Sequence, residues 1–295
     1  MAHFQATASR SCPHLLFQKG RIPTLTLLLT FLATLAGIQM AQAQDGRSIL
    51  LKTLRYYQSL HSYLGQANVD TLMIDTNGQT VKHVGSSALM KMQRPNKIFI
   101  FLENPISSRK IYSDGTQFSV YEASPNQYTT APTTGTQQDL LTLLRNRGKV
   151  IPGYDALYFL TETSLPKELS DIRLKGTSTV NGHSVYVVTG ATPAPPTAGK
   201  SGATSTTSYW TWWIDRKSYL LYKVETKIPN TVRPVSFGSG VQEVTKNVRG
   251  TMIVRYTVSA IKPDATIAPS DFVFTPPKTA TQKRTVEDIL RGRNN

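Results

Sequence analysis

The chain has 295 residues, with 33 Lys and Arg against 18 Asp and Glu and one Cys. Its positive charge favours anionic partners such as lipid headgroups or acidic glycans, although a solubilising surface explains dispersed Lys and Arg equally simply. No basic block with interleaved aromatic residues occurs, so we expect no nucleic-acid partner. The single cysteine, Cys12, excludes an intramolecular disulfide framework.

Residues 1–43 have the composition of an export signal. A basic start without acidic residues precedes the apolar run 22–38, and small residues follow it up to Ala43. We predict a signal peptide that is cleaved after Ala43, which leaves residues 44–295 as a single domain in the periplasm. The alternative is an uncleaved membrane anchor, although the apolar run is shorter than the ~20 residues that usually span a bilayer.

The segment that follows predicts a helix and then a hairpin. Residues 46–64 carry apolar side chains at helical spacing, which predicts an amphipathic helix. Its predicted apolar face consists of Leu50, Leu54, Tyr57, His61 and Leu64. Residues 66–75 and 79–92 have strand patterns and flank Asn77-Gly78, a dipeptide typical of tight hairpin turns.

Three more strands are predicted next. Residues 96–103 are apolar on both faces, so we expect this strand to be covered on both sides. Residues 109–113 and 116–122 flank Asp114-Gly115, which we interpret as a turn sequence and not as part of a catalytic site.

The second half of the chain continues this pattern. Residues 137–148 have helical spacing, and residues 191–208 are rich in Pro, Gly, Ser and Thr, which predicts a flexible loop. The remaining predicted strands are 171–180, 183–191, 209–215, 219–228, 250–261 and 271–274, and a short helix is predicted over 284–292.

Hairpin connections mean antiparallel pairing, and a curled sheet must cover its apolar face. Two or three helices are too few to cover two faces of such a sheet. We therefore predict an α+β fold: an unclosed antiparallel β half-barrel of about ten to eleven strands, with helices covering its concave face.

No catalytic or metal-binding motif is found. Gly199-Lys200-Ser201 resembles the end of a phosphate-binding loop, but Ala194 replaces the first glycine that this loop requires. The histidines after the signal, His61, His83 and His183, have no partner at metal-ligand spacing. We expect no cofactor, no metal and no enzymatic activity, while carboxylates far apart in sequence leave a hydrolase as a third possibility.

Strand alternation gathers large apolar side chains on one face. A half-open sheet with few helices leaves part of such a face toward a cavity that fits an acyl chain, although core packing is the simpler role for any one residue. Each buried CH₂ contributes ~0.8 kcal/mol, so a long chain needs no charged partner. The candidate ligand-binding residues are Phe118, Val120, Trp210, Trp212, Ile214, Leu220, Tyr222, Val224, Met252, Val254 and Tyr256.

Several short motifs resemble the LolA/LolB-type lipoprotein carriers. Arg94-Pro95 precedes a strand, and Ser113-Asp114-Gly115 leads to an aromatic strand that is followed by Pro125 and Gln127. The sequence "DFVFTPP" (271–277) is similar to the closing strand of that family. The resemblance implies an exported, unclosed antiparallel barrel that is capped by helices and contains a hydrophobic cavity. The 191–208 insertion, the triple tryptophan and residues 229–247 depart from the classical carrier.

Two functions of different classes follow. The first is a monomeric, non-enzymatic periplasmic carrier that binds a lipid or the acyl chain of a lipoprotein. The alternative is an envelope sensor or scaffold domain that binds an inner- or outer-membrane protein. The sequence leaves open the identity of the cargo and whether residues 191–208 gate the cavity.

Overall fold

The computed structural model describes residues 46–105, 107–133, 156–193, 207–237, 244–283 and 285, all of which belong to one compact unit, Ala41–Asn295. The predicted signal peptide, the 137–148 helix, residues 194–206 of the predicted loop and all of the predicted 284–292 helix except Thr285 lie outside these residues. The two ends of the predicted loop, residues 191–193 and 207–208, are in strands instead. Within the described part of the chain, no helix has the length and apolar character that crossing a membrane requires.

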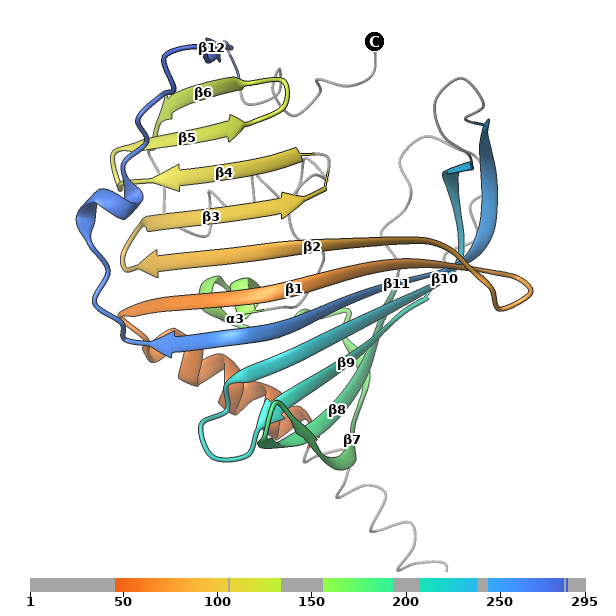
Figure 1. Cartoon of the computed structure of the whole chain (residues 1–295). Helices are drawn as coiled ribbons and strands as arrows, with labels where there is room; N and C mark the ends of the chain where they lie inside the picture. Colours follow the sequence, from red (N-terminus) through yellow and green to blue (C-terminus); the bar gives the residue numbers. More distant parts are fainter. Residues whose placement is uncertain are drawn as a thin grey trace, which may run out of the picture. The chain divides into compact units, whose positions relative to one another are not determined.

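Twelve strands form one sheet (Figure 1). Their bounds are β1 Ser62–Asp75, β2 Thr80–Gln93, β3 Lys97–Asn104, β4 Ser107–Ser113, β5 Gln117–Glu122, β6 Gln127–Pro132, β7 Ser170–Val180, β8 His183–Pro193, β9 Thr207–Asp215, β10 Leu221–Phe237, β11 Val244–Pro263 and β12 Thr281–Gln282. The spatial order is β12-β6-β5-β4-β3-β2-β1-β11-β10-β9-β8-β7. Every neighbouring pair is antiparallel except β12–β6.

This order confirms the predicted unclosed, mainly antiparallel sheet, because β12 and β7 are the two ends of the order and do not pair with each other among the described residues. The strand count is slightly higher than expected, and one predicted strand is wrong. Residues 271–274 do not form a strand, because Pro269–Phe272 is a 3-10 helix that begins with a proline. The short strands β6 and β12 were not expected from the sequence.

Residues 46–59 form the predicted amphipathic helix, and its side chains Leu50, Leu54 and Tyr57 are buried. The helix ends earlier than expected, so His61 and Leu64 are not part of it and Leu64 lies in β1. The carboxylate of Asp264 accepts a hydrogen bond from the backbone N–H of His61 at 2.8 Å, which holds the chain in its turn from the helix into β1.

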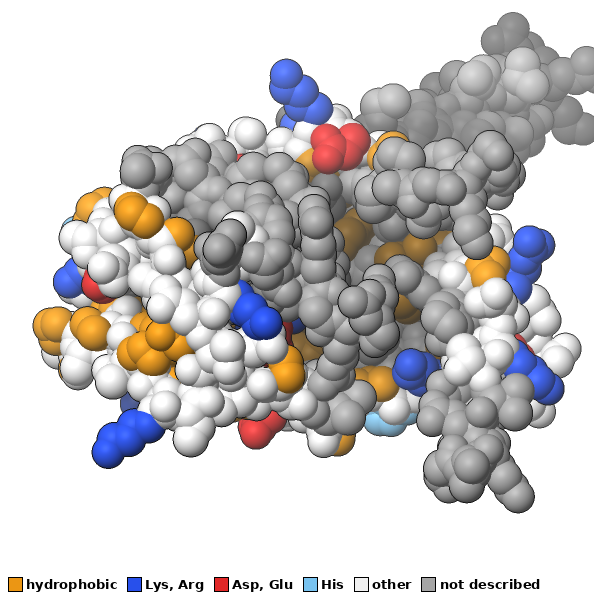
Figure 2. All heavy atoms as spheres, turned by 90° about the horizontal axis from the view of Figure 1, so that it is seen from above, with side chains coloured by type: hydrophobic (Ala, Val, Ile, Leu, Met, Phe, Trp, Pro, Cys, Tyr) orange, Lys and Arg blue, Asp and Glu red, His pale blue; other side chains and the backbone are white. Residues whose placement is uncertain are grey.

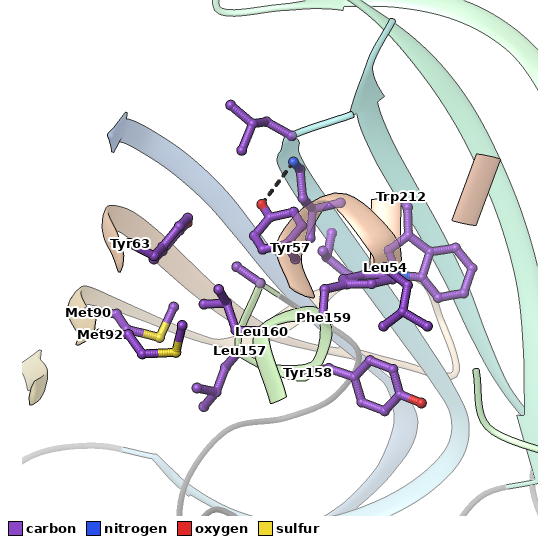
Figure 3. Packing of buried hydrophobic residues seen from close by; sticks show 14 of the residues in the cluster. Leu54, Tyr57, Tyr63, Met90, Met92, Leu157, Tyr158, Phe159, Leu160 and Trp212 are labelled. Atoms are coloured by element: carbon purple, nitrogen blue, oxygen red, sulfur yellow. Dashed lines mark hydrogen bonds between the residues drawn. The ribbon is translucent and has the colours of Figure 1, made fainter. Parts of the chain in front are cut away.

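A second helix, α3 (Ala156–Thr161), is short and completely buried. Figure 1 shows α3 and the 46–59 helix on the same side of the sheet. Figure 3 shows side chains from both helices converging with inward side chains of the strands, including Tyr63 and Trp212. The helices therefore cover part of the concave face, as the fold prediction required.

The outer face of β3 is covered by the chain after β11. Phe99, whose neighbours Ile98 and Ile100 point into the main core, packs on the other side against Ile267 and Phe272. This arrangement confirms that β3 is covered on both faces. After this contact with β3, the same segment reaches β12, which pairs with β6.

The Asp114-Gly115 sequence forms the predicted turn between β4 and β5. The Asp114 carboxylate accepts hydrogen bonds from the backbone N–H groups of Thr116 and Gln117, both at 2.7 Å. Partial burial works to raise the pKa of this carboxyl, but these hydrogen bonds outweigh it and the pKa is lowered. Asp114 is thus held in a structural role in the turn.

Candidate functional site

The concave face contains a cavity of about 330 Å³ beyond the part that the two helices fill. Its walls come from β1, β2, β3, β4, β5, β10 and β11. The apolar lining residues are Val69, Ala88, Leu102, Val224, Val254 and Tyr256. The polar lining residues are Thr71, Ser86, Ser87, Glu103, Asn104, Ser107, Arg109, Glu122 and Thr226. Figure 2 shows hydrophobic side chains deep in a hollow of the molecule, with Lys and Arg side chains on the surrounding surface.

Strand alternation explains why these residues meet. On β1, Val69 and Thr71 have the same parity as Tyr63 in the core, with a register shift between Gln66 and Ala67. Across the sheet, Val69 lies opposite Tyr256 of β11, and Tyr256 lies opposite Val224 of β10. The cavity is the continuation of the core face along the strands, at positions where smaller and more polar side chains replace the large ones.

A charged pair occupies the β4–β5 side of the cavity. Arg109 and Glu122 are direct partners across these strands and form an ion pair from Arg109 Nε to Glu122 Oε1. Their side chains are only 19% and 9% exposed, and the Ser107 hydroxyl donates to the second Glu122 oxygen at 3.4 Å. Burying two charges is costly unless they are paired, so the pairing of Arg109 with Glu122 allows both charges to lie beside the apolar lining residues.

The structure divides the predicted ligand-binding residues into three groups. Val224, Val254 and Tyr256 line the cavity. Six others are buried in the main core with less than a tenth of their surface exposed: Phe118, Val120, Trp210, Trp212, Ile214 and Leu220.

Two more predicted residues lie elsewhere. Met252 is half-buried opposite Met73 of β1. Tyr222 stacks on the His183 ring with 4.1 Å between centroids, next to the β9–β10 turn. Because none of these positions has been tested with a ligand, their role in binding stays a prediction.

The tryptophans of β9 illustrate the core role. Trp210 and Trp212 stack with ring centroids 6.2 Å apart, and the Trp210 indole N–H donates to the Thr192 hydroxyl at 3.0 Å. Trp212 is fully buried against the helices (Figure 3). Trp213 points to the other face, where the Lys223 ammonium lies 4.4 Å from its ring centroid.

Sequence reasoning missed Arg109 and Glu122. The available signal was the strand register: Arg109 has the parity of Ile111, and Glu122 has the parity of Val120, both of which are fully buried. A charged residue of each sign at core-facing positions on neighbouring strands predicts an inward ion pair. That signal becomes usable only when the β4–β5 turn fixes which residues are opposite each other.

Arg94 connects the two helices that cover part of the concave face. Its guanidinium donates to the carbonyls of Leu60 at 2.8 Å and Tyr57 at 3.3 Å, at the end of the 46–59 helix, and to that of Leu160 in α3 at 3.0 Å. Burial lowers the pKa of Arg94. These bonds satisfy carbonyls that the helix end leaves without intrahelical partners, and they fix the helices relative to each other.

No site for a metal is apparent in the described part of the chain, where no cluster of three His, Cys, Asp or Glu side chains occurs. The described histidines instead pair individually with carboxylates. His83 lies 2.8 Å from Asp70, and His183 lies 3.6 Å from Asp215. The His83–Asp70 pair is on the outer side of β1 and β2, and the His183–Asp215 pair is next to the β9–β10 turn. Neither pair contributes to the cavity lining.

Comparison with known proteins assigns this chain to a protein family. A family model described as "Predicted periplasmic protein (DUF2092)" matches residues 46–231, which is more than half of the chain. The chain belongs to the DUF2092 family. The match extends from the first helix to β10 and thus includes β1 to β5 around the cavity. No curated protein matches the sequence significantly.

Solved structures that the chain resembles have low sequence identity. The lipoprotein LppX of Mycobacterium tuberculosis is 15% identical, with a TM-score of 0.38, over 76% of this chain and 98% of that one. LprF of Mycobacterium bovis is 12% identical, with a TM-score of 0.36, over 80% and 98%. A LolA superfamily protein from Nitrosomonas europaea is 11% identical, with a TM-score of 0.29, over 78% and 97%.

Proposed function

We propose that this DUF2092 protein is a non-enzymatic carrier that binds the acyl chain of a lipid or of a lipoprotein. In this proposal it acts in the periplasm as a monomer, after cleavage of its signal peptide behind Ala43. The observation that carries the proposal is the cavity of about 330 Å³ on the concave face. Ligand sites of small molecules typically begin at about this volume and have mainly apolar linings with a few polar groups.

The apolar lining supports an acyl ligand over a polar one. Val69, Ala88 and Leu102 approach from β1 to β3, and Val224 and Val254 approach from β10 and β11. An acyl chain between these two walls gains ~0.8 kcal/mol for each CH₂ that it buries.

The first experiment is purification of the protein without detergent, followed by native mass spectrometry and lipid extraction. We expect acyl-containing ligands to copurify and an added fluorescent acyl probe to bind. If no acyl ligand is found and no probe binds, the carrier function is wrong. Recovery of one membrane protein in stoichiometric amount without any lipid would instead favour the sensor or scaffold function.

A cavity-filling substitution tests the location of the site. Ala88 is buried and lines the cavity, so Ala88→Phe should reduce the affinity for the acyl probe by about tenfold or more, because the ring takes the space of several methylene groups. Thr177→Phe is the matched control, because Thr177 is exposed on β7 and remote from the lining residues. Equal affinities of both variants would place the ligand elsewhere.

A further inference from the structure

We propose that the cavity selects acyl ligands whose polar end is uncharged, such as an ester or an amide, and disfavours free fatty acids. The Arg109–Glu122 pair on its β4–β5 wall would make this selection. The inference rests on the proposed function, because it assumes that an acyl chain occupies the cavity.

The position of the pair defines the polar end of the cavity. Arg109 lies opposite Leu102 on β3, and Leu102 lies opposite Ala88 on β2. The charged pair is therefore directly adjacent to the apolar lining residues of β2 and β3. The facing wall is formed by Val224, Val254 and other residues of β10 and β11. A chain that lies along the apolar wall therefore brings its polar end toward β4 and β5.

The charge balance at this end does not suit an anion. The Arg109 guanidinium is already paired with Glu122, and the Ser107 hydroxyl holds the other oxygen of that carboxylate. Glu103 has the strand parity of Phe99 on the outer face of β3, so the described charges that face inward are one guanidinium and one carboxylate, which neutralise each other. A fatty-acid carboxylate, which is ionised at neutral pH, would enter this partly buried site where the only inward cation among the described lining residues is already paired, and Glu122 would repel it.

An uncharged polar end avoids this repulsion and still finds hydrogen-bond partners. Ester and amide carbonyls accept hydrogen bonds, and the hydroxyls of Ser86 and Thr71 line the same cavity. Acylglycerols and the acylated end of a lipoprotein share this chemistry, since both attach the acyl chain through a neutral bond. The cavity would distinguish both from a free fatty acid.

The experiment measures the affinities of the mature protein for dodecanoate and for monododecanoylglycerol at neutral pH. We expect the neutral ligand to bind about tenfold more tightly. Glu122→Gln should raise the ratio of the dodecanoate affinity to the monododecanoylglycerol affinity by about tenfold, because it removes the carboxylate that neutralises Arg109 and repels the ligand carboxylate. Equal wild-type affinities, or an unchanged ratio in Glu122→Gln, would overturn the inference.

Breaking a buried ion pair often destabilises a protein strongly, so circular dichroism must show that Glu122→Gln is folded, and the wild-type comparison tests the inference without any variant. Glu103→Gln is the matched control, because it removes an exposed carboxylate with the outer-face parity of β3, and it should leave the ratio of the two affinities unchanged within about twofold. A change of this ratio as large as that in Glu122→Gln would contradict the assignment of the selection to the inward pair. Failure of both ligands to bind the wild type would refute the carrier function itself, whereas binding with the wrong preference refutes only the selectivity.

The two neutral sources are separated by a third probe, a synthetic peptide with a diacylated N-terminal cysteine. Tighter binding of this peptide than of monododecanoylglycerol would assign lipoproteins as the preferred cargo. Weaker binding would assign free acylglycerols. In either case the selection against a free carboxylate should persist.

Discussion

The Tyr57 hydroxyl accepts a hydrogen bond from the backbone N–H of Leu221 at 3.1 Å, and both residues are fully buried. This contact joins the first helix to the start of β10 across more than half of the chain (Figure 3). The helix thereby supplies a partner for a strand N–H group that lies out of reach of water.

The Tyr57 hydroxyl is expected to stabilise the fold through this bond. Tyr57→Phe keeps the ring but leaves the Leu221 N–H without this acceptor, so the free energy of unfolding should fall by about 1–3 kcal/mol. Urea unfolding monitored by circular dichroism measures this change. Tyr56→Phe is the control, because the Tyr56 ring is only half-buried, and it should change stability by less than about 0.5 kcal/mol. Equal losses in both variants would argue against a specific role of the bond.

Arg94 should be more important for stability than any exposed basic residue of the first helix. Arg94→Met removes the donor to three carbonyls of the two helices and should lower the free energy of unfolding by about 2–4 kcal/mol. Arg55→Met, at an exposed position of the 46–59 helix, should have almost no effect. The comparison needs only denaturant midpoints and slopes of the two variants. If Arg94→Met leaves the free energy of unfolding unchanged, hydrophobic packing alone holds the helices in place.

The carboxylate of Asp215 should make stability depend on acidic pH. Its Oδ1 atom accepts hydrogen bonds from the backbone N–H of Lys217 at 2.9 Å and from the N–H and hydroxyl of Ser218 at 2.7 and 2.9 Å. Burial works to raise the pKa of Asp215, but these bonds and nearby His183 outweigh it, so the pKa lies below its usual 3.8.

Because the folded-state pKa is lowered, the stabilisation is complete above the unfolded pKa and is lost as the pH falls through the folded pKa. Wild type should therefore exceed Asp215→Asn in stability at neutral pH, and this difference should shrink below a pH of about 4. Unfolding curves at several pH values measure it. Asp171→Asn, with a side chain that is 70% exposed, serves as the control for the loss of an exposed carboxylate. A constant difference for Asp215→Asn would contradict the assignment.

Gly250 allows the close approach of β11 and β1. A Cβ atom at Gly250 would lie 1.9 Å from the carbonyl oxygen of Ile74, so Gly250→Ala must displace one strand and should lower stability by about 1–3 kcal/mol. Gly85 on β2 has open space around the corresponding position, so Gly85→Ala should be neutral or stabilising by up to about 1 kcal/mol. Thermal unfolding of both variants tests the contrast. Similar melting temperatures would show that the two strands can separate at no cost.

Turn residues and the periodicity of apolar side chains were sufficient to predict much of the fold from the sequence. The Asn77-Gly78 and Asp114-Gly115 turns were identified from residues that tolerate left-handed backbone, and the structure has positive φ at Gly78 and Gly115. The alternation of Phe118 and Val120 in β5 and the helical spacing of Leu50, Leu54 and Tyr57 gave the correct buried faces. The wrong strand at 271–274 arose because Phe272 and Phe274 alternate as in a strand, whereas the structure buries Phe272 from a 3-10 helix that packs on the outer face of β3.

By itself, the sequence determined which side chains face inward, because turn residues and strand periodicity act over a few neighbouring residues. Only the tertiary structure decided which inward side chains meet a helix and which border a cavity. The side chains of Trp212 and Val254 both point to the concave face of the sheet. The helices bury Trp212 in the core, whereas Val254 lines the cavity. The physical reason is that helix placement depends on contacts such as Tyr57 with Leu221 and Arg94 with Leu160, which join residues far apart in the chain.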